Sequence, residues 1–416
     1  MDEKKLYNRW LIAIMCTVLM VVLGSVYAWS FFQKLIVTQY GWSNSQVAWV
    51  FSTSIAFLGF AAAWGGINLP KYGARKLALI GAVLYGSGYL LGAVAFSLHN
   101  LPLLLAGFGV VGGIGLGLAY VTPVVTAARW FPDRKGFITG MVVMGFGLGA
   151  LIMSKVIAPL VMAHTFGDLI MGFFYIGIII LMLGIAAASF VIEPEPVSAN
   201  GAPGTNDTGM MKAAIGSVLS KEFLFMWILF FVNITAGIMF IGFQSPLMQD
   251  IMQKQDPSLS TTALAAIGAT LIAVSSLFNG IGRFFWGSLS DKIGRIQAFR
   301  LIIGSQILVF IVLSFVANPW LFAALVCYIL LCYGGGFGTM PSFVSDVFTA
   351  RLMPVVYGFI LTAWSIGGIA GPQIVALMKD HFPDTAARYS FLTGACFLVI
   401  GFIISFFLNK KPAHEC

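Results

Sequence analysis

The chain has 416 residues, of which 59% are hydrophobic and only 9% are charged, whereas soluble domains carry about 25% charged residues. This composition excludes a soluble domain and predicts a polytopic membrane protein. The net charge of +8 does not indicate nucleic-acid binding, because the basic residues lie in short loops beside long apolar segments, which is the pattern that orients helices in a bilayer.

Apolar runs long enough to cross a bilayer, about 20 residues each, occur twelve times along the chain. The first run is too long for the apolar region of a signal peptide, which covers about 7–15 residues, so we interpret it as the first span. The twelve predicted helices cover residues 10–32, 47–69, 77–98, 101–128, 136–162, 169–192, 222–247, 263–288, 298–317, 320–346, 355–378 and 387–408.

The segment between the sixth and seventh predicted helices is rich in Pro, Gly, Ser and Asn. A segment of this composition cannot bury itself and is typical of a flexible tether. We therefore expect an N-terminal six-helix half over residues 1–192, a cytoplasmic linker over 193–220 and a C-terminal six-helix half over 221–416.

Lys and Arg residues are distributed unevenly between the two faces of the predicted bundle. Seventeen lie on the face that carries both termini and the linker, and four lie on the opposite face. Since the basic face of a membrane protein stays inside the cell, we expect both termini in the cytoplasm. The predicted location is a bacterial-type inner membrane, in which the chain crosses the lipid bilayer many times.

The two predicted halves contain matching segments at a nearly constant spacing. Residues 66–75, after the second predicted helix, match residues 287–295 after the eighth, 221 residues later. Residues 112–115 match 334–337 with a step of 222 residues. Parallel six-helix repeats, with a substrate site between them near the membrane midplane, are the architecture of the major facilitator superfamily. The pattern therefore predicts an all-α membrane protein with twelve transmembrane helices in two pseudo-symmetric halves.

Residues 287–295 read Gly-x-x-x-Asp-Lys-x-Gly-Arg. This resembles the cytoplasmic loop motif of the superfamily, and its chemistry is a charge cluster at a helix end that can form and break between transporter states. The first copy carries Pro70 in place of the acid, so its basic residues have the alternative role of orienting the chain only. Two further arginines are related by the step of 222 residues. The predicted gating residues are Asp291, Lys292, Arg295, Arg129 and Arg351.

Arg283 is an ionisable residue inside the eighth predicted helix. Such a residue is costly in a membrane unless it faces a polar or water-filled interior, and its planar guanidinium matches a carboxylate. Ser275, Ser276 and Asn279 continue one polar helix face at i−8, i−7 and i−4. We predict that Arg283 binds an anion, with Asn279 beside it. The alternatives are an arginine that reaches the cytoplasmic interface and an asparagine that joins two helices.

Several stretches resemble the oxalate–formate exchanger and monocarboxylate transporter branch of the superfamily. They are residues 8–10, 24–30 and 129–136, and the pattern Asn-x-x-x-Arg-x-x-Trp-Gly at 279–287. In that branch the arginine of the eighth helix binds the substrate carboxylate. The resemblance therefore implies this role for Arg283.

Five aromatic residues complete the predicted substrate site. The hydroxyl of Tyr120 is a candidate donor to the carboxylate, and Tyr27 and Tyr333 are further candidates of the same kind. We expect Phe337 and Trp364 to form an apolar wall that limits the size of the substrate. Ordinary helix packing is the alternative for each of these residues.

Two differences from that branch narrow the predicted substrate. The oxalate exchanger carries a lysine where this chain has Trp364, so a second carboxylate would lack a cation, and one arginine favours a monoanion. Animal monocarboxylate transporters carry an aspartate where this chain has Asn279, and a lysine near the position of Phe31. A proton would therefore use a peripheral carboxylate or travel with the substrate. The peripheral candidates are Asp250, Asp256 and Asp346.

We therefore expect a secondary active transporter of a small monocarboxylate such as lactate, pyruvate or formate, working by alternating access as a monomer. Proton symport is the preferred source of energy, an oxalate–formate type exchanger is the first alternative, and a transporter-like anion sensor is the second. The sequence shows no nucleophile–base constellation, and its five cysteines lack metal-like spacing. We expect neither an enzyme nor a bound metal or cofactor.

Overall fold

The computed structural model describes residues 8–131, 135–194, 213, 215–348 and 352–408, and every regular element in these ranges is a helix. Twelve helical segments are long and apolar enough to cross a membrane. A helix suits that surrounding because it satisfies its own backbone hydrogen bonds where water is absent. Most of the predicted linker and the predicted gating residue Arg351 lie outside the described residues.

The first six spans form one half of the molecule. The first span passes through a short 3₁₀ segment, and the fourth and fifth each contain a π-helical segment. The elements are α1 (Arg9–Gly24), η1 (Ser25–Ala28), α2 (Trp29–Tyr40), α3 (Asn44–Tyr72), α4 (Ala74–Ser97), α5 (Leu101–Leu104), η2 (Leu105–Gly112), α6 (Gly113–Trp130), α7 (Lys135–Ile152), η3 (Met153–Ile157), α8 (Ala158–His164) and α9 (Leu169–Ala188).

The last six spans form the second half. The eleventh span of the chain is interrupted at Leu361, which lies between the end of α15 and the start of α16. The elements are α11 (Lys221–Gln255), α12 (Thr261–Ile293), α13 (Arg295–Leu313), α14 (Pro319–Val347), α15 (Met353–Ile360), α16 (Thr362–His381) and α17 (Ala386–Ile404).

Two spans continue furthest, by eight residues each, beyond the ends that the sequence predicts. The first predicted helix, 10–32, belongs to a span that continues to Tyr40, and the seventh, 222–247, continues to Gln255. An apolar run marks only the part of a helix that crosses the bilayer, whereas the helix itself continues until a residue ends it. Gly41, with a φ of 68°, ends the first of these helices.

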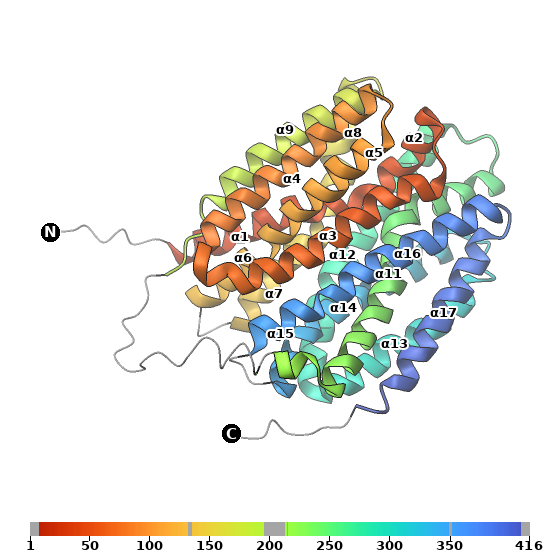
Figure 1. Ribbon diagram of the computed structural model, residues 1–416. Coiled ribbons are helices and arrows are strands. Elements are labelled where there is room, and N and C mark those ends of the chain that lie inside the picture. The colour runs from red at the N-terminus through yellow and green to blue at the C-terminus, as the bar shows by residue number, and fades with distance from the viewer. Residues whose placement is uncertain (1–7, 132–134, 195–212, 214, 349–351, 409–416) are drawn as a thin grey trace, which may run out of the picture.

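Small residues bring the two halves close together. α3 of the first half packs along α16 of the second, as Figure 1 shows, and α7 packs along α12. A Cβ atom on Gly147 would lie 2.9 Å from the Cα of Gly280, and one on Gly59 would overlap the Ser365 hydroxyl oxygen. Glycine permits such an approach of two membrane helices because it has no side chain.

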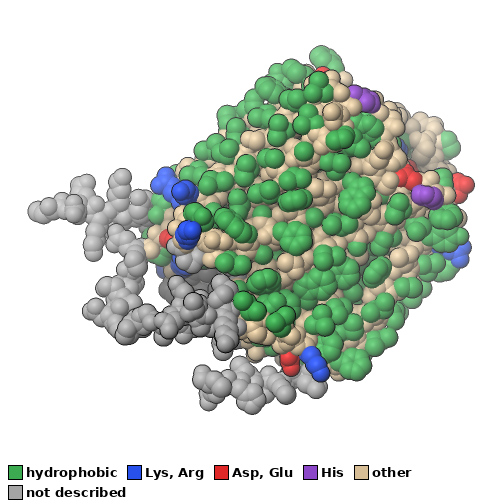
Figure 2. Space-filling view, viewed as in Figure 1, with side chains coloured by type: hydrophobic (Ala, Val, Ile, Leu, Met, Phe, Trp, Pro, Cys, Tyr) green, Lys and Arg blue, Asp and Glu red, His purple; other side chains and the backbone are tan. Residues whose placement is uncertain are grey.

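The ends and the middle of the bundle differ in polarity. α1 begins and α17 ends at the same end of the bundle (Figure 1), which we call the terminal end; we call the other the opposite end. Figure 2 shows hydrophobic side chains over the middle of one face and charged side chains toward its two ends. A bilayer requires such an apolar band. The chain is a multi-pass membrane protein.

An added methyl group tests the close contact of α12 with α14. A Cβ on Gly282 would overlap the carbonyl oxygen of Leu331, whereas a Cβ on Gly140 would meet no atom within 4 Å. We expect Gly282→Ala to lower the unfolding temperature of the detergent-solubilised protein, because overpacking costs about 1–3 kcal/mol. Gly140→Ala should leave that temperature unchanged or slightly higher. Equal unfolding temperatures of the two variants would contradict this packing.

Candidate functional site

A buried arginine lies where the two halves meet. Arg283, on α12, is 3% exposed. Its guanidinium carbon lies 4.8 Å from the ring centre of Phe337 on α14 and 5.9 Å from that of Phe146 on α7. Because these rings come from different halves, the guanidinium lies between the halves and remains inside the protein instead of extending to an interface.

The guanidinium makes no hydrogen bond of standard geometry, although the Tyr120 hydroxyl lies near enough to interact with it. All three nitrogens of Arg283 are buried and lack a hydrogen-bond partner. A buried charge without a partner costs several kcal/mol, and two aromatic faces recover only part of this, about 0.5–2 kcal/mol for a cation–π contact. The geometry therefore leaves a planar set of donors that fits an anion with two acceptor oxygens.

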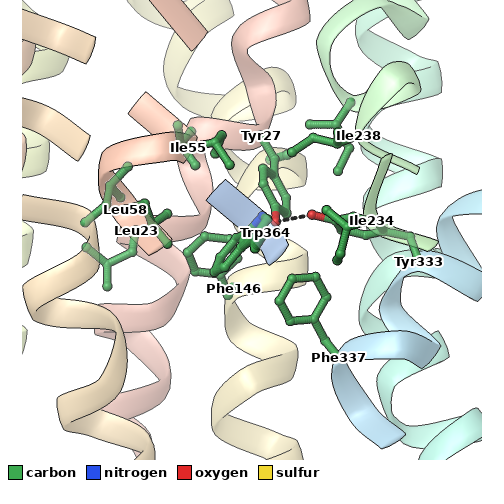
Figure 3. Close-up of a cluster of buried hydrophobic side chains, with 14 of the residues drawn as sticks. Leu23, Tyr27, Ile55, Leu58, Phe146, Ile234, Ile238, Tyr333, Phe337 and Trp364 are labelled. Atoms are coloured by element: carbon green, nitrogen blue, oxygen red, sulfur yellow. Dashed lines mark hydrogen bonds between the residues drawn. The ribbon is translucent and has the colours of Figure 1, made fainter. Parts of the chain in front are cut away.

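Two tyrosines join the halves beside this arginine. The hydroxyl oxygens of Tyr27 and Tyr333 lie 2.6 Å apart and share a hydrogen bond, which Figure 3 shows as a dashed line. Tyr27 lies on the 3₁₀ segment η1 and Tyr333 on α14. A short 3₁₀ stretch inside a longer helix often marks a hinge, and in the first span that stretch carries Tyr27.

Two further tyrosines lie within electrostatic range of the guanidinium. Tyr120 on α6 and Tyr357 on α15 both interact with Arg283. The ring of Tyr120 also contacts Phe146, with ring centres 5.2 Å apart. Hydroxyl groups at this place add donors to those of the guanidinium.

Trp364, on α16, closes the aromatic cluster. Its side chain is fully buried, and its indole nitrogen has no hydrogen-bond partner. Figure 3 shows it among the other rings. The ring centres within 6.4 Å of it belong to Phe337, Tyr120, Phe146 and Tyr27. Trp364 therefore adds an apolar ring surface to the cluster and an N–H donor without a hydrogen-bond partner.

Asn279 lies one turn from Arg283 at a helix contact. Its side chain is buried, and its Oδ1 atom has no partner. A Cβ on Gly334 of α14 would overlap the Asn279 carbonyl oxygen and lie 2.9 Å from Oδ1. This position matches the alternative role of a residue between two helices, and none of the ring contacts described above includes it.

The two serines of the same helix face bind elsewhere. Ser275 donates a hydrogen bond to the side-chain oxygen of Gln244 on α11 at 2.6 Å. Ser276 donates to the carbonyl oxygen of Gly147 on α7. The predicted polar face of α12 therefore contacts three neighbouring helices, and Arg283 alone of its residues lies against the aromatic rings.

Three of the predicted gating residues make ion pairs at the terminal end. Arg295 pairs with Asp291 at 2.6 Å and with Asp346 at 3.0 Å, all within the second half. Arg129 pairs with Glu193. Lys292 is exposed in the last turn of α12.

Two further residues beside Arg283, Phe146 and Tyr357, are not among the site residues predicted from the sequence. Phe146 lies between glycines that pack against α1 and α12, so the glycine pattern of residues 145–149 leaves the ring facing inward. Tyr357 and Trp364 are seven residues apart, and side chains at that spacing share a helix face. Both signals are visible in the sequence once the site is known.

The chain matches known transporters over most of its length. The family model described as Major Facilitator Superfamily matches residues 14–372. An oxalate:formate antiporter of Oxalobacter formigenes is 26% identical over 97% of this chain and 92% of its own length. The apicoplast pyruvate carrier 1 of Toxoplasma gondii is 28% identical over 76% of this chain and 66% of its own length. Human monocarboxylate transporter 10 is 23% identical over 89% of this chain and 71% of its own length.

Solved structures share the fold. A D-xylose–proton symporter superposes with a TM-score of 0.70 at 14% identity, over 98% of each chain. A bacterial homologue of the human lysosomal transporter Spinster, in an inward-facing and unoccupied conformation, superposes with a TM-score of 0.71 at 15% identity, over 96% of each chain.

Removal of the unpaired charge should stabilise the protein without ligand. Arg283 is buried and has no acceptor, and replacing such a group by an apolar one is often favourable. We expect Arg283→Met to raise the unfolding temperature measured without any added anion. The control is Arg295→Met, which breaks two ion pairs and should not raise it. A lower unfolding temperature for Arg283→Met would show that the guanidinium is compensated.

Proposed function

This chain belongs to the Major Facilitator Superfamily. We propose that it carries small monocarboxylate anions across a membrane by alternating access, with proton symport as the preferred mode. The observation that carries the proposal is the guanidinium of Arg283, which is buried between the halves and lacks an acceptor. A carboxylate supplies two oxygens that match two parallel N–H donors of a guanidinium.

The charges of the site favour a monoanion. Arg283 is the one cation that contacts the aromatic cluster in the described part of the chain. One carboxylate neutralises it. A second carboxylate would meet the neutral indole of Trp364, and an unpaired charge in such a site is costly. The indole N–H and the tyrosine hydroxyls are donors suited to a neutral oxygen of the substrate.

The way the two halves share the site supports alternating access. The hydrogen bond between Tyr27 and Tyr333 and the contacts of Arg283 with Phe146 and Phe337 all involve both halves. An anion bound to Arg283 would therefore contact groups of either half. Rocking of the halves about a fixed site is the transport mode of this architecture.

The relatives support the substrate class by their printed names, which describe an oxalate:formate antiporter, a pyruvate carrier and monocarboxylate transporters. We extend this class to the present chain. We also propose that it functions as a monomer in a cell inner membrane with the terminal end in the cytoplasm, because the basic residues gather at that end.

Anion exchange is the second candidate function. Among the described contacts of Arg283 none involves a carboxylate, so no acid at the site is placed to accept a proton. A proton would have to travel on the substrate or use a peripheral acid. Uptake into proteoliposomes that responds to an imposed pH gradient supports symport, whereas uptake that requires internal anion and ignores the gradient supports exchange.

Uptake by arginine variants tests the proposed anion site. We expect Arg283→Gln to reduce uptake of labelled lactate by about 100-fold or more, because loss of one partner of a buried charged pair costs about 3–5 kcal/mol. Arg388→Gln is the matched control, since Arg388 lies over Phe315, away from the site, and should retain uptake. Full lactate, pyruvate and formate uptake by Arg283→Gln would contradict the proposal.

A second cation should change the preferred charge of the substrate. Trp364→Lys places an amine where the indole now contacts Phe337. We expect this variant to gain stabilisation by oxalate in a thermal-shift measurement, because a dianion then finds two cations. Trp364→Phe keeps an aromatic ring without a donor and should show no gain with oxalate. The account of charge selection is wrong if oxalate stabilises neither variant or both equally.

A further inference from the structure

A carboxylate of the second half caps a helix of the first half at the opposite end. Asp380, in the last turns of α16, accepts hydrogen bonds from the backbone N–H of Asn44 at 3.0 Å and of Ser45 at 2.9 Å. The side-chain amide of Asn44 donates a third at 3.2 Å. Asn44 and Ser45 begin α3, a helix of 29 residues, so the carboxylate lies at the positive end of the helix dipole.

A second charged contact crosses the halves near the first. Lys34 of α2 lies 3.7 Å from Asp250 of α11. Lys379 also pairs with Asp250, but α16 and α11 belong to the same half. Both partners of the Lys34 pair are 41% exposed, and exposed ion pairs of this kind contribute little to stability.

The contact of Asp380 is the stronger of the two. Both of its oxygens are used, the donors include backbone N–H groups that a helix start leaves unpaired, and the bonds are partly buried. Hydrogen bonds to a charged group are about twice as strong as neutral ones. Breaking them would leave the backbone N–H groups of Asn44 and Ser45 to water, although the capping box of Ser43 and Gln46 would remain at the start of α3.

The terminal end has a different arrangement. The ion pairs described there stay within one half each: Arg129 pairs with Glu193, and Arg295 pairs with Asp291 and Asp346. Near its C-terminal end, α3 carries Pro70 where the repeated motif has an acid. In the described part of the chain, charged contacts therefore hold α3 to α16 at the opposite end alone.

We propose that the hydrogen bonds of Asp380 to the start of α3 hold the carrier closed at the opposite end until α3 and α16 separate there. We call this contact the latch. The inference rests on the proposed alternating access but not on the identity of the anion. A carrier that opens at this end must replace the three hydrogen bonds by water. In the carrier without substrate, the latch therefore favours conformations that are closed at the opposite end.

Distances between spin labels test the latch in the full-length protein without any anion. One label is placed by Leu98→Cys and one by Trp320→Cys, at exposed sites of the two halves at the opposite end. The background carries Cys396→Ser and Cys416→Ser. We expect Asp380→Ala to raise the ratio of the long-distance to the short-distance population about tenfold, which corresponds to about 1.4 kcal/mol. Asp380→Asn keeps an acceptor oxygen and should give a smaller rise.

Asp384→Ala is the matched control, because Asp384 is an exposed acid four residues further along the chain. It should leave the distances of wild type. Labels placed by Lys76→Cys and Gln297→Cys at the terminal end should move closer in Asp380→Ala, a reciprocal change that a misfolded variant would not produce. Unchanged distances in Asp380→Ala, or equal changes in Asp384→Ala, would overturn the latch. Neither result would affect the uptake test of Arg283, which reports on the anion site alone.

Discussion

The candidate site is organised around one buried positive charge. The guanidinium of Arg283 is buried, touches two aromatic faces and has no acceptor. Proteins rarely keep such a group in a membrane unless function requires it. The rest of the site surrounds this group. Aromatic rings cover it, donors without partners lie beside it, and helices from both halves enclose it. Under the proposed function, a bound carboxylate would offset the cost of burying this charge.

The helices that enclose the site are interrupted close to it. Tyr27 lies on a 3₁₀ segment between α1 and α2, and Trp364 follows the break at Leu361 between α15 and α16. Thr362 at that break accepts a hydrogen bond from Trp227, which ties the start of α16 to α11. Interruptions of this kind let parts of one span move separately, so site residues lie where the helices can change direction.

Much of the fold could be predicted from the sequence, because apolar runs, basic loops and a repeat of about 222 residues specify twelve spans in two halves. Arg283 could also be predicted, since a charge in an apolar run stands out by itself. Phe146 and Tyr357 could not be distinguished from other aromatic residues. Their role arises where helices of different halves cross, and a repeat within the sequence does not specify that crossing.

The contacts of Asn279 and Asp380 also could not be predicted from the sequence. Asn279 shares a helix face with Arg283 in sequence, yet α14 packs so closely that the side chain lies at the helix contact. Asp380 follows an apolar run, and no residue near it in the sequence indicates that it binds Asn44 and Ser45. Its binding to α3 depends on how two helix ends, far apart in sequence, meet in space.

A structure of the purified protein with lactate would show where the anion binds. We expect the carboxylate beside Arg283, with its two oxygens about 2.7–2.9 Å from two guanidinium nitrogens and the rest of the molecule against Phe337 and Trp364. Lactate bound elsewhere, or a guanidinium that keeps its present surroundings while lactate is bound, would contradict this expectation.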